Sequence, residues 1–268
     1  MVIIFCATRF EISGFLRKLR LTEKITSGKI KAFYGYFKNS GKNLSGSPLL
    51  LILTGIGREN ASEAAELFIS GIFNNTRPPV KSSGNLMIVI GFGGSLTKEL
   101  KLCDTVVAND LKKYPLEKER PCIAINDTIF PEHEDNFKIF RNTGCQRYVS
   151  FATVDRIVTE SSQKMQIRES TGSHVIDMES YWIAEKLHKR YRNQIHLRVI
   201  SDDLDSGIPG VLNLLSKCGT IRKKVSVLFF HLITRPKTII HLFLFFKNIF
   251  RCQRTLSKKL ENILADIV

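Results

Sequence analysis

Two short acidic segments of the chain contain residue types suited to chemistry on a sugar. Met178 and Glu179 stand just before a predicted helix, and Ser201 and Asp202 follow an apolar segment. A carboxylate can accept hydrogen bonds from sugar hydroxyls, while a neighbouring thioether lies against the ring. An aspartate at the end of a strand can deliver a proton to a heterocyclic leaving group, a task that usually requires partial burial. The two segments together predict cleavage of a bond between a ribose and its base.

Glu11 is the third candidate, because it follows the first predicted strand, just after Ala7. A carboxylate at this position could activate an attacking water molecule. Plainer structural roles are open for all of these side chains. Glu11 and Glu179 could interact with a helix dipole, Met178 could fill the core, and Asp202 could cap a helix.

Apolar segments alternate with segments of helical periodicity. Buried strands are predicted at residues 2–7, 49–53, 85–90, 105–110 and 195–200. Helices are predicted at residues 11–21, 60–73 and 180–191, the first with Ile12, Phe15, Leu16 and Leu19 on one face. This alternation favours a three-layer α/β/α fold around a mixed, largely parallel sheet.

Glycines follow two of the predicted strands. Gly55 and Gly57 follow the second strand, and Gly91, Gly93 and Gly94 follow the third. Glycine turns after strands let a ligand approach the backbone closely, although each also fits an ordinary tight turn. The second group does not match G-x-G-x-x-G, so no dinucleotide site is predicted.

The composition limits the class of protein. The 268 residues, 43% of them hydrophobic, can bury a sizeable core, and the net charge of +15 predicts an anionic partner. The six cysteines are scattered without a C-x-x-C pair, so we expect reduced thiols and no zinc site. No basic segment precedes the apolar start, so we expect a cytoplasmic protein.

The composition changes near Ser206, which divides the chain into a predicted catalytic domain at residues 1–210 and an extension at 211–268. Ten basic residues lie between positions 222 and 259, around apolar runs at 225–233 and 239–246. Neither run reaches the ~20 residues of a membrane span, and Arg235-Pro236-Lys237 separates them. We expect a cationic, amphipathic and aromatic-rich helical extension.

The order of these segments resembles the nucleoside phosphorylase superfamily, in particular its methylthioadenosine/S-adenosylhomocysteine nucleosidase branch. The resemblance covers roughly residues 1–205, and its motifs are Ala7–Glu11, Thr54–Gly57, Gly91–Leu96, Cys103–Val107, Asp177–Ser180 and Arg198–Asp202.

The resemblance implies a role for each candidate. Glu11 would activate water, Glu179 and Met178 would bind ribose, and Asp202 with Ser201 would face and protonate the purine. The further substrate contacts that it implies are Gly93, Gly94 and Phe151. It implies no metal and no organic cofactor, and it predicts a homo-oligomer because such proteins commonly complete the pocket with a second subunit.

Some residues depart from the branch's pattern. Arg9-Phe10 replaces a run of acids before Glu11, and the bulky Phe92 replaces a small residue. Phosphorylases of the superfamily carry arginine-based phosphate pockets, for which Arg9 and Arg58 are the candidates here. Hydrolysis is favoured over phosphorolysis because Glu11 is present.

The basic tail resembles that of the hopanoid-associated phosphorylase subgroup, which implies removal of adenine from adenosylhopane, a lipid-linked nucleoside. An interfacial helix would suit such a substrate, because aromatic side chains enter the acyl boundary and basic ones contact anionic lipid. We therefore expect a peripheral site on the inner face of the cytoplasmic membrane. The apolar residues concerned are Phe229, Phe230, Leu242, Phe243, Phe245, Phe246 and Phe250.

Other interpretations stay open. The tail could form a dimer interface, since exposed apolar patches mark interfaces in general. The chain could act on a soluble substrate as a methylthioadenosine or S-adenosylhomocysteine nucleosidase, or as a purine nucleoside phosphorylase. A non-catalytic basic module for membrane or nucleic acid is a further class, although no RNA-binding signature is present and no nucleic-acid partner is expected.

Overall fold

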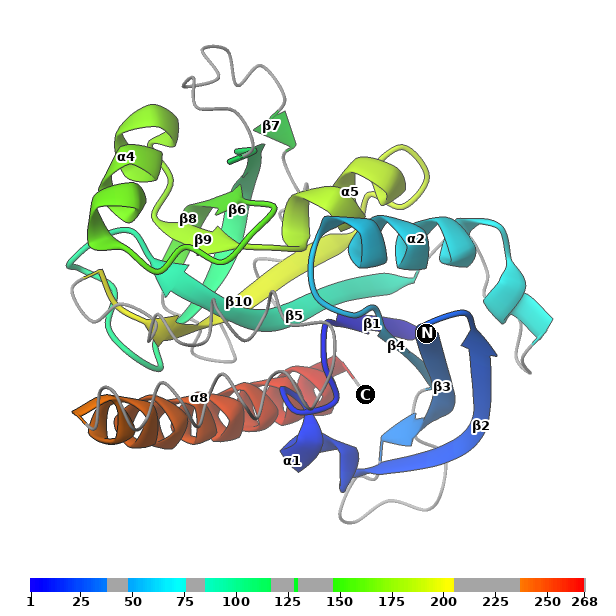
Figure 1. Ribbon diagram of the computed structural model, residues 1–268. Helices are drawn as coiled ribbons and strands as arrows, with labels where there is room; N and C mark the ends of the chain where they lie inside the picture. The colour runs from blue at the N-terminus through cyan, green and yellow to red at the C-terminus, as the bar shows by residue number, and fades with distance from the viewer. Residues whose placement is uncertain (38–47, 76–84, 117–127, 130–146, 205–236, 268) are drawn as a thin grey trace.

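A ten-stranded mixed sheet forms the centre of the described part of this computed structural model (Figure 1). The structure describes residues 1–37, 48–75, 85–116, 128–129, 147–204 and 237–267. The strands are β1 Val2–Cys6, β2 Leu19–Ser27, β3 Ile30–Phe37, β4 Pro48–Leu53, β5 Leu86–Ser95, β6 Thr105–Lys113, β7 Thr128–Ile129, β8 Arg147–Thr153, β9 Val175–Asp177 and β10 Gln194–Asp202. The helices are α1 Ser13–Leu16, α2 Arg58–Ile69, the 3-10 turn η1 Ile72–Asn75, α4 Ser161–Thr171, α5 Ser180–Leu187 and α8 Lys237–Ile267.

The strands run in the order β10-β6-β8-β9-β5-β1-β4-β3-β2, and β10 also pairs with β5. This extra pairing closes a ring of five strands, β10, β6, β8, β9 and β5. The ring brings the ends of β5, β9 and β10 together. Gly94 of β5 is the register partner of both Asp202 of β10 and Ile176 of β9. The pairings of β1 with β4 and β5, and of β5 with β10, are parallel.

Helices cover both faces of the sheet. Helices α2 and α5 pack together on one face, while α1 and α8 lie on the other (Figure 1). The predicted three-layer α/β/α class with a mixed sheet is confirmed.

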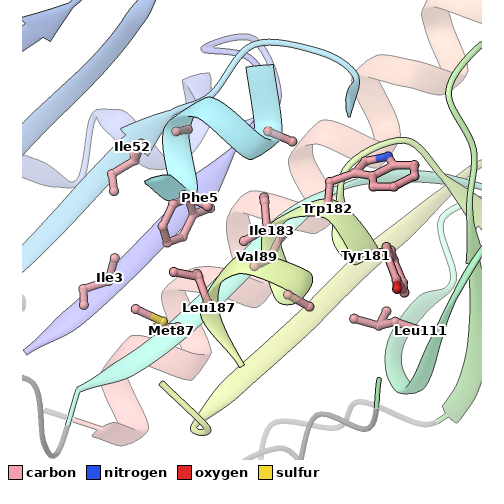
Figure 2. Packing of buried hydrophobic residues seen from close by; sticks show 14 of the residues in the cluster. Ile3, Phe5, Ile52, Met87, Val89, Leu111, Tyr181, Trp182, Ile183 and Leu187 are labelled. Carbon is pink, nitrogen blue, oxygen red and sulfur yellow. The ribbon is translucent and has the colours of Figure 1, made fainter. Parts of the chain in front are cut away.

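The core explains why the central strands are continuous apolar runs. Ile3 and Phe5 of β1 pack beneath α2 and α5 in the cluster of Figure 2, whereas Val2, Ile4 and Cys6 pack toward α1 and α8. Side chains alternate between the faces of a strand, so a strand with both faces covered must be apolar at every position.

The predicted helix at residues 11–21 is wrong over most of its length. Helix α1 ends at Leu16, and β2 begins at Leu19. Ile12, Phe15 and Leu19 are buried as expected, but Leu19 is buried as the first residue of a strand. The neighbouring strand β3 pairs with β2 over its whole length, and this long-range pairing outweighs the local helical spacing.

The glycines at residues 91–94 lie inside β5 and not in a turn after it. Side chains fill the space around them: a Cβ at Gly93 would lie 2.8 Å from Val175 Cγ1, and one at Gly94 would lie 2.8 Å from Asp202 Oδ2. Glycine is required here because neighbouring strands and side chains approach closely, not because of a turn.

The predicted C-terminal helix is present as α8. Its second half joins the core beneath the sheet through Cys252, Leu256, Leu260, Ile263 and Leu264. The second half of α8 thus packs on the sheet and belongs to the same hydrophobic core. The predicted boundary at 210 and the apolar run at 225–233 lie outside the described residues. Among the described helices, none is long and apolar enough to cross a membrane.

Candidate active site

A cavity of about 460 Å³ lies beside the ends of β1, β5, β9 and β10. Its volume is typical of small-molecule sites. Seven residues predicted from the sequence line it: Glu11, Gly93, Gly94, Met178, Glu179, Ser201 and Asp202. The closed arrangement of strands brings these residues together from positions up to 191 apart in the sequence (202 − 11).

Glu11 is buried and held entirely by nearby donors. Its Oε2 atom accepts hydrogen bonds from the Thr8 backbone N–H at 2.7 Å and from Thr8 Oγ1 at 3.1 Å. The Cys6 thiol donates to the same oxygen at 3.3 Å, and the Phe92 N–H donates to Oε1 at 3.3 Å. Helix α1 has no acidic residue in its first turn, so Glu11 is not a helix-dipole partner. Its carboxylate is fixed at the wall of the cavity.

Glu179 stands at the N-cap position of α5 but forms no capping hydrogen bond with its side chain. Its Oε1 atom instead accepts a hydrogen bond of 2.9 Å from the Gly57 N–H. Gly57 has φ of 89°, a conformation that favours glycine. Burial raises the pKa of Glu179 from its ordinary value to about 8, against the opposing effect of Arg198. This side chain can therefore hold a proton near neutral pH and can both donate and accept hydrogen bonds.

Arg198 and Asp177, to which the sequence alone gave no role, form an ion pair beside Glu179. Arg198 is 1% exposed, and its Nη2 atom lies 2.7 Å from Asp177 Oδ2 and 4.0 Å from Glu179 Oε2. Asp177 Oδ1 also accepts a hydrogen bond of 2.6 Å from Thr153 Oγ1. An arginine within the apolar segment 195–200 was the available signal, because a buried charge requires a charged partner.

Asp202 ends β10 and is 5% exposed. Ser201 Oγ donates to its Oδ1 at 2.8 Å, and Lys164 Nζ donates to its Oδ2 at 2.5 Å. Partial burial of this carboxyl was expected from the sequence, but its contact with Lys164 was not. Nothing in the local sequence of α4 marks that lysine as a buried partner.

Helix α8 provides much of the apolar side of the cavity, through Phe245, Phe246 and Ile249. Phe10 also lines it, and its ring contacts the rings of Phe92 and Phe250 edge-on, with centroids 6.5 and 5.4 Å apart. Other apolar lining residues are Ala7, Ile56, Val154, Ile157, Val158 and Ile176.

Three predicted residues lie away from the cavity. Phe151 is fully buried in the core from β8, and Val154, just after the end of that strand, lines the cavity instead. Arg9 and Arg58 are exposed and are absent from the lining, and the Arg58 guanidinium lies 4.7 Å from the centre of the Trp182 ring. The predicted substrate contact by Phe151 and the predicted phosphate pocket at Arg9 and Arg58 thus involve residues that lie outside this cavity.

Solved structures with the same fold support this assignment of architecture. Futalosine hydrolase of Helicobacter pylori superposes with a TM-score of 0.68 at 17% identity, covering 98% of this chain and 97% of that one. The 5′-methylthioadenosine/S-adenosylhomocysteine nucleosidase of Neisseria meningitidis gives 0.67 at 17% identity, covering 100% and 99%. The nucleosidase of the same name from Campylobacter jejuni gives 0.68 at 16% identity, covering 100% and 99%.

A comparison with curated protein sequences finds no match. The family model described as the phosphorylase superfamily matches residues 1–226, which is most of the chain and includes every lining residue except those of α8. The chain therefore belongs to the phosphorylase superfamily.

Proposed function

We propose that this protein hydrolyses the N-glycosidic bond of an adenine nucleoside whose ribose carries a large apolar substituent, with adenosylhopane as the specific candidate. The observation that carries the proposal is the convergence of Glu11, Glu179 and Asp202 on one cavity. Each carboxyl is held by named hydrogen bonds, and none of the three caps a described helix.

In the proposed reaction, Asp202 faces the adenine. Its carboxyl accepts a hydrogen bond from the exocyclic amino group and passes a proton to a ring nitrogen as the glycosidic bond breaks. Ser201 supports this step because its hydroxyl fixes one carboxyl oxygen. Gly93 and Gly94 leave room for the base, since a side chain at Gly94 would clash with Asp202.

The sugar is proposed to lie between Met178, Glu179 and Glu11. Glu179 binds ribose hydroxyls, and Met178 lies against the ring. Glu11 orients and deprotonates the attacking water, which its fixed carboxylate can do without further rearrangement. The transition state resembles an oxocarbenium ion, so anionic and polarisable groups around the ring stabilise it.

Hydrolysis fits the cavity better than phosphorolysis. A phosphate dianion beside Glu11 would meet a buried carboxylate, and like charges at short range in a site of low polarity repel strongly. Arg9 and Arg58 lie outside the cavity, and the buried Arg198 is paired with Asp177. Arg156 lines the cavity, and its guanidinium donates a hydrogen bond of 3.2 Å to the Leu116 carbonyl oxygen.

The apolar substituent is proposed to lie against α8. Phe245, Phe246 and Ile249 line the cavity, and the first half of the helix continues this surface outward with Ile240 and Phe243, which are 63% and 68% exposed. Further along α8, the exposed side chains include four basic ones, Lys247, Arg251, Arg254 and Lys258, together with Phe250 and, near the end of the helix, Asp266. An apolar surface next to cationic side chains suits an anionic membrane, where a lipid-linked nucleoside would reside.

The membrane contact can be tested without removing α8, whose second half belongs to the core. We expect Arg251→Glu, Arg254→Glu and Lys258→Glu together to weaken binding to anionic vesicles, at about 1 kcal/mol per charge at low salt. Sedimentation with phosphatidylserine vesicles measures this. Equal sedimentation of the variant and the wild type at low salt would contradict the contact.

A second copy of the chain is proposed to complete the cavity, as the resemblance implies. Ile56 and Phe10 line the cavity and are 55% and 39% exposed, so they offer an apolar surface for it. Light scattering at micromolar concentration should give twice the mass of the chain. A monomer would exclude this arrangement.

The experiment that tests the proposed function is chromatography of free adenine. The substrates are adenosylhopane in detergent micelles and 5′-methylthioadenosine in buffer, each with and without phosphate. We expect adenine from the lipid substrate at a rate that does not depend on phosphate. Equal or better cleavage of methylthioadenosine would identify a soluble-nucleoside hydrolase, the second candidate, which the fold relatives favour.

The remaining outcomes would replace the proposal. Release that requires phosphate would make the reaction a phosphorolysis. No adenine from either substrate, with an intact fold, would exclude adenine as the base and leave the membership of the superfamily unchanged.

A further inference from the structure

Lys164 is a fully buried cation behind the cavity. It lies in the second turn of α4 and is 0% exposed. Its Nζ atom donates to Asp202 Oδ2 at 2.5 Å and to the Asp203 carbonyl oxygen at 2.6 Å. Asp202 lines the cavity, whereas Lys164 does not. The carboxyl therefore stands between the lysine and any molecule in the cavity.

A buried ammonium is costly unless a charged partner compensates it, and removing one partner of such a pair leaves the other uncompensated. The pairing has a chemical consequence for Asp202. Both carboxyl oxygens of Asp202 accept hydrogen bonds, Oδ2 from Lys164 and Oδ1 from Ser201. The proton that lies nearest to Oδ2 is therefore the one that Lys164 donates.

The leaving base needs a proton in the proposed function, on which this inference rests. The described lining of the cavity contains no histidine, lysine, tyrosine or cysteine. Its arginine, Arg156, does not lose its proton in proteins. Glu11 and Glu179 are assigned to the water and the ribose, and Asp177, which also lines the cavity, is paired with Arg198. The ammonium of Lys164 is the proton donor that is already bonded to Asp202.

We propose that Lys164 is a positioning residue that acts through Asp202 and stores the proton delivered to the leaving base. As the bond between C1′ and the base nitrogen breaks, its electron pair passes to the base. A ring nitrogen takes a proton from Asp202 Oδ2, and that oxygen takes one from Lys164 Nζ, which becomes a neutral amine.

Water completes the balance. Its oxygen bonds to C1′ and its proton passes to Glu11, so the products are neutral adenine and the free sugar. Proton exchange with solvent after release returns Glu11 to its carboxylate and Lys164 to its ammonium. No oxidant, reductant or metal is involved.

The experiment compares two leaving groups. One substrate is the adenine nucleoside that the wild type cleaves, either adenosylhopane or methylthioadenosine, and the other is p-nitrophenyl β-D-ribofuranoside. Nitrophenolate leaves as a stable anion and needs no proton. For Lys164→Met, we expect the ratio of kcat on the adenine nucleoside to kcat on the nitrophenyl riboside to fall about 100-fold, the size of a general-acid contribution.

Controls separate this role from a structural one. Lys186→Met removes a lysine that pairs with Glu66 at the surface, so this ratio should stay within twofold of the wild type. Lys164→Arg keeps the charge but gives up its proton far less readily, so it should rescue folding and not the ratio. If Lys164→Met does not fold, the double variant Lys164→Met/Asp202→Asn replaces it, because this variant removes both buried charges. Its ratio of the two kcat values should lie within twofold of the ratio for Asp202→Asn alone, because the two residues act as one unit.

The outcomes are distinct. If Lys164→Met lowers kcat equally on both substrates, or leaves both unchanged, the ratio stays the same and the inference is overturned, because Lys164 is then at most a structural partner. A double variant with a clearly lower ratio than Asp202→Asn would also overturn the inference. Failure of the wild type to release adenine would instead remove the proposed function and this inference with it.

Discussion

The two sides of the cavity differ in how their side chains are held. On the polar side, Glu11 and Asp202 are 7% and 5% exposed, and each carboxyl has at least two named donors. On the α8 side, Phe246 is 47% exposed, and the apolar face continues beyond the cavity to Phe243. Fixed polar groups suit a reaction that needs set positions, whereas an open apolar surface suits a bulky substituent of loosely defined shape.

This contrast separates chemistry from recognition. Changes on the polar side should impair cleavage of every adenine nucleoside, through kcat or through KM, while changes on the α8 side should reduce kcat/KM only for apolar substrates. The four substitutions below test this division, from the largest expected effect to the smallest.

Asp202→Asn should lower kcat by about 10²- to 10⁴-fold, because the leaving base loses its route to a proton. Adenine release under saturating substrate measures this, and circular dichroism checks the fold. Asp104→Asn, outside the cavity lining, is the matched control and should retain activity. Near-normal turnover by Asp202→Asn would remove the acid role from this residue.

Glu11→Gln should lower kcat about 100-fold with a smaller change in KM, because the amide can still accept from Thr8 but cannot take a proton from water. Steady-state kinetics separate the two constants. Glu63→Gln, on the exposed side of α2, should have no effect. A rise in KM with unchanged kcat would indicate that Glu11 binds substrate and does not activate water.

Glu179→Gln should raise KM about tenfold through loss of a ribose contact, and it should also change the pH dependence of stability. The folded-state pKa is raised to about 8 by burial, so the folded protein holds this proton at pH values where the unfolded chain has lost it. The stabilisation is complete at low pH and is lost as the pH rises from the ordinary value of glutamic acid through about 8, by at most about 1.4 kcal/mol per pH unit.

Thermal unfolding at pH 6 and pH 9 measures this effect. The wild type should lose more stability between the two values than Glu179→Gln does. Equal losses would show that Glu179 ionises normally in the folded protein.

Phe246→Ala should lower kcat/KM for the lipid-linked nucleoside about tenfold, which corresponds to about 1.4 kcal/mol of lost apolar contact. The effect on methylthioadenosine should be less than twofold. Leu21→Ala is the control, because Leu21 is an exposed apolar residue of β2 that lies outside the cavity lining and away from α8. Equal losses on both substrates would break the division between the two sides.

Local patterns in the sequence were sufficient to predict the central strands and to select seven residues that line the cavity. The central strands are buried on both faces and are therefore visible as apolar runs, as in β1 and β4. Met178-Glu179 and Ser201-Asp202 stand at element ends, where residue type and position together indicate a site.

Features that depend on distant pairing were missed. Strand β2 exposes five consecutive residues and is held by β3, so its sequence does not show a buried face. Gly91 and Gly93 were interpreted as a turn because the strands that pack against them lie more than 80 residues away. Lys164 is an ordinary helix residue until Asp202, 38 positions later, is brought to it.

The most direct test of the central claim, that this cavity holds and cleaves an adenine nucleoside, is a crystal structure of Asp202→Asn with an uncleaved nucleoside. We predict the base edge within hydrogen-bond distance of position 202, ribose hydroxyls on Glu179, and the 5′ substituent against Phe245 and Phe246. A nucleoside bound elsewhere, or a cavity that stays empty at saturating nucleoside, would contradict the account.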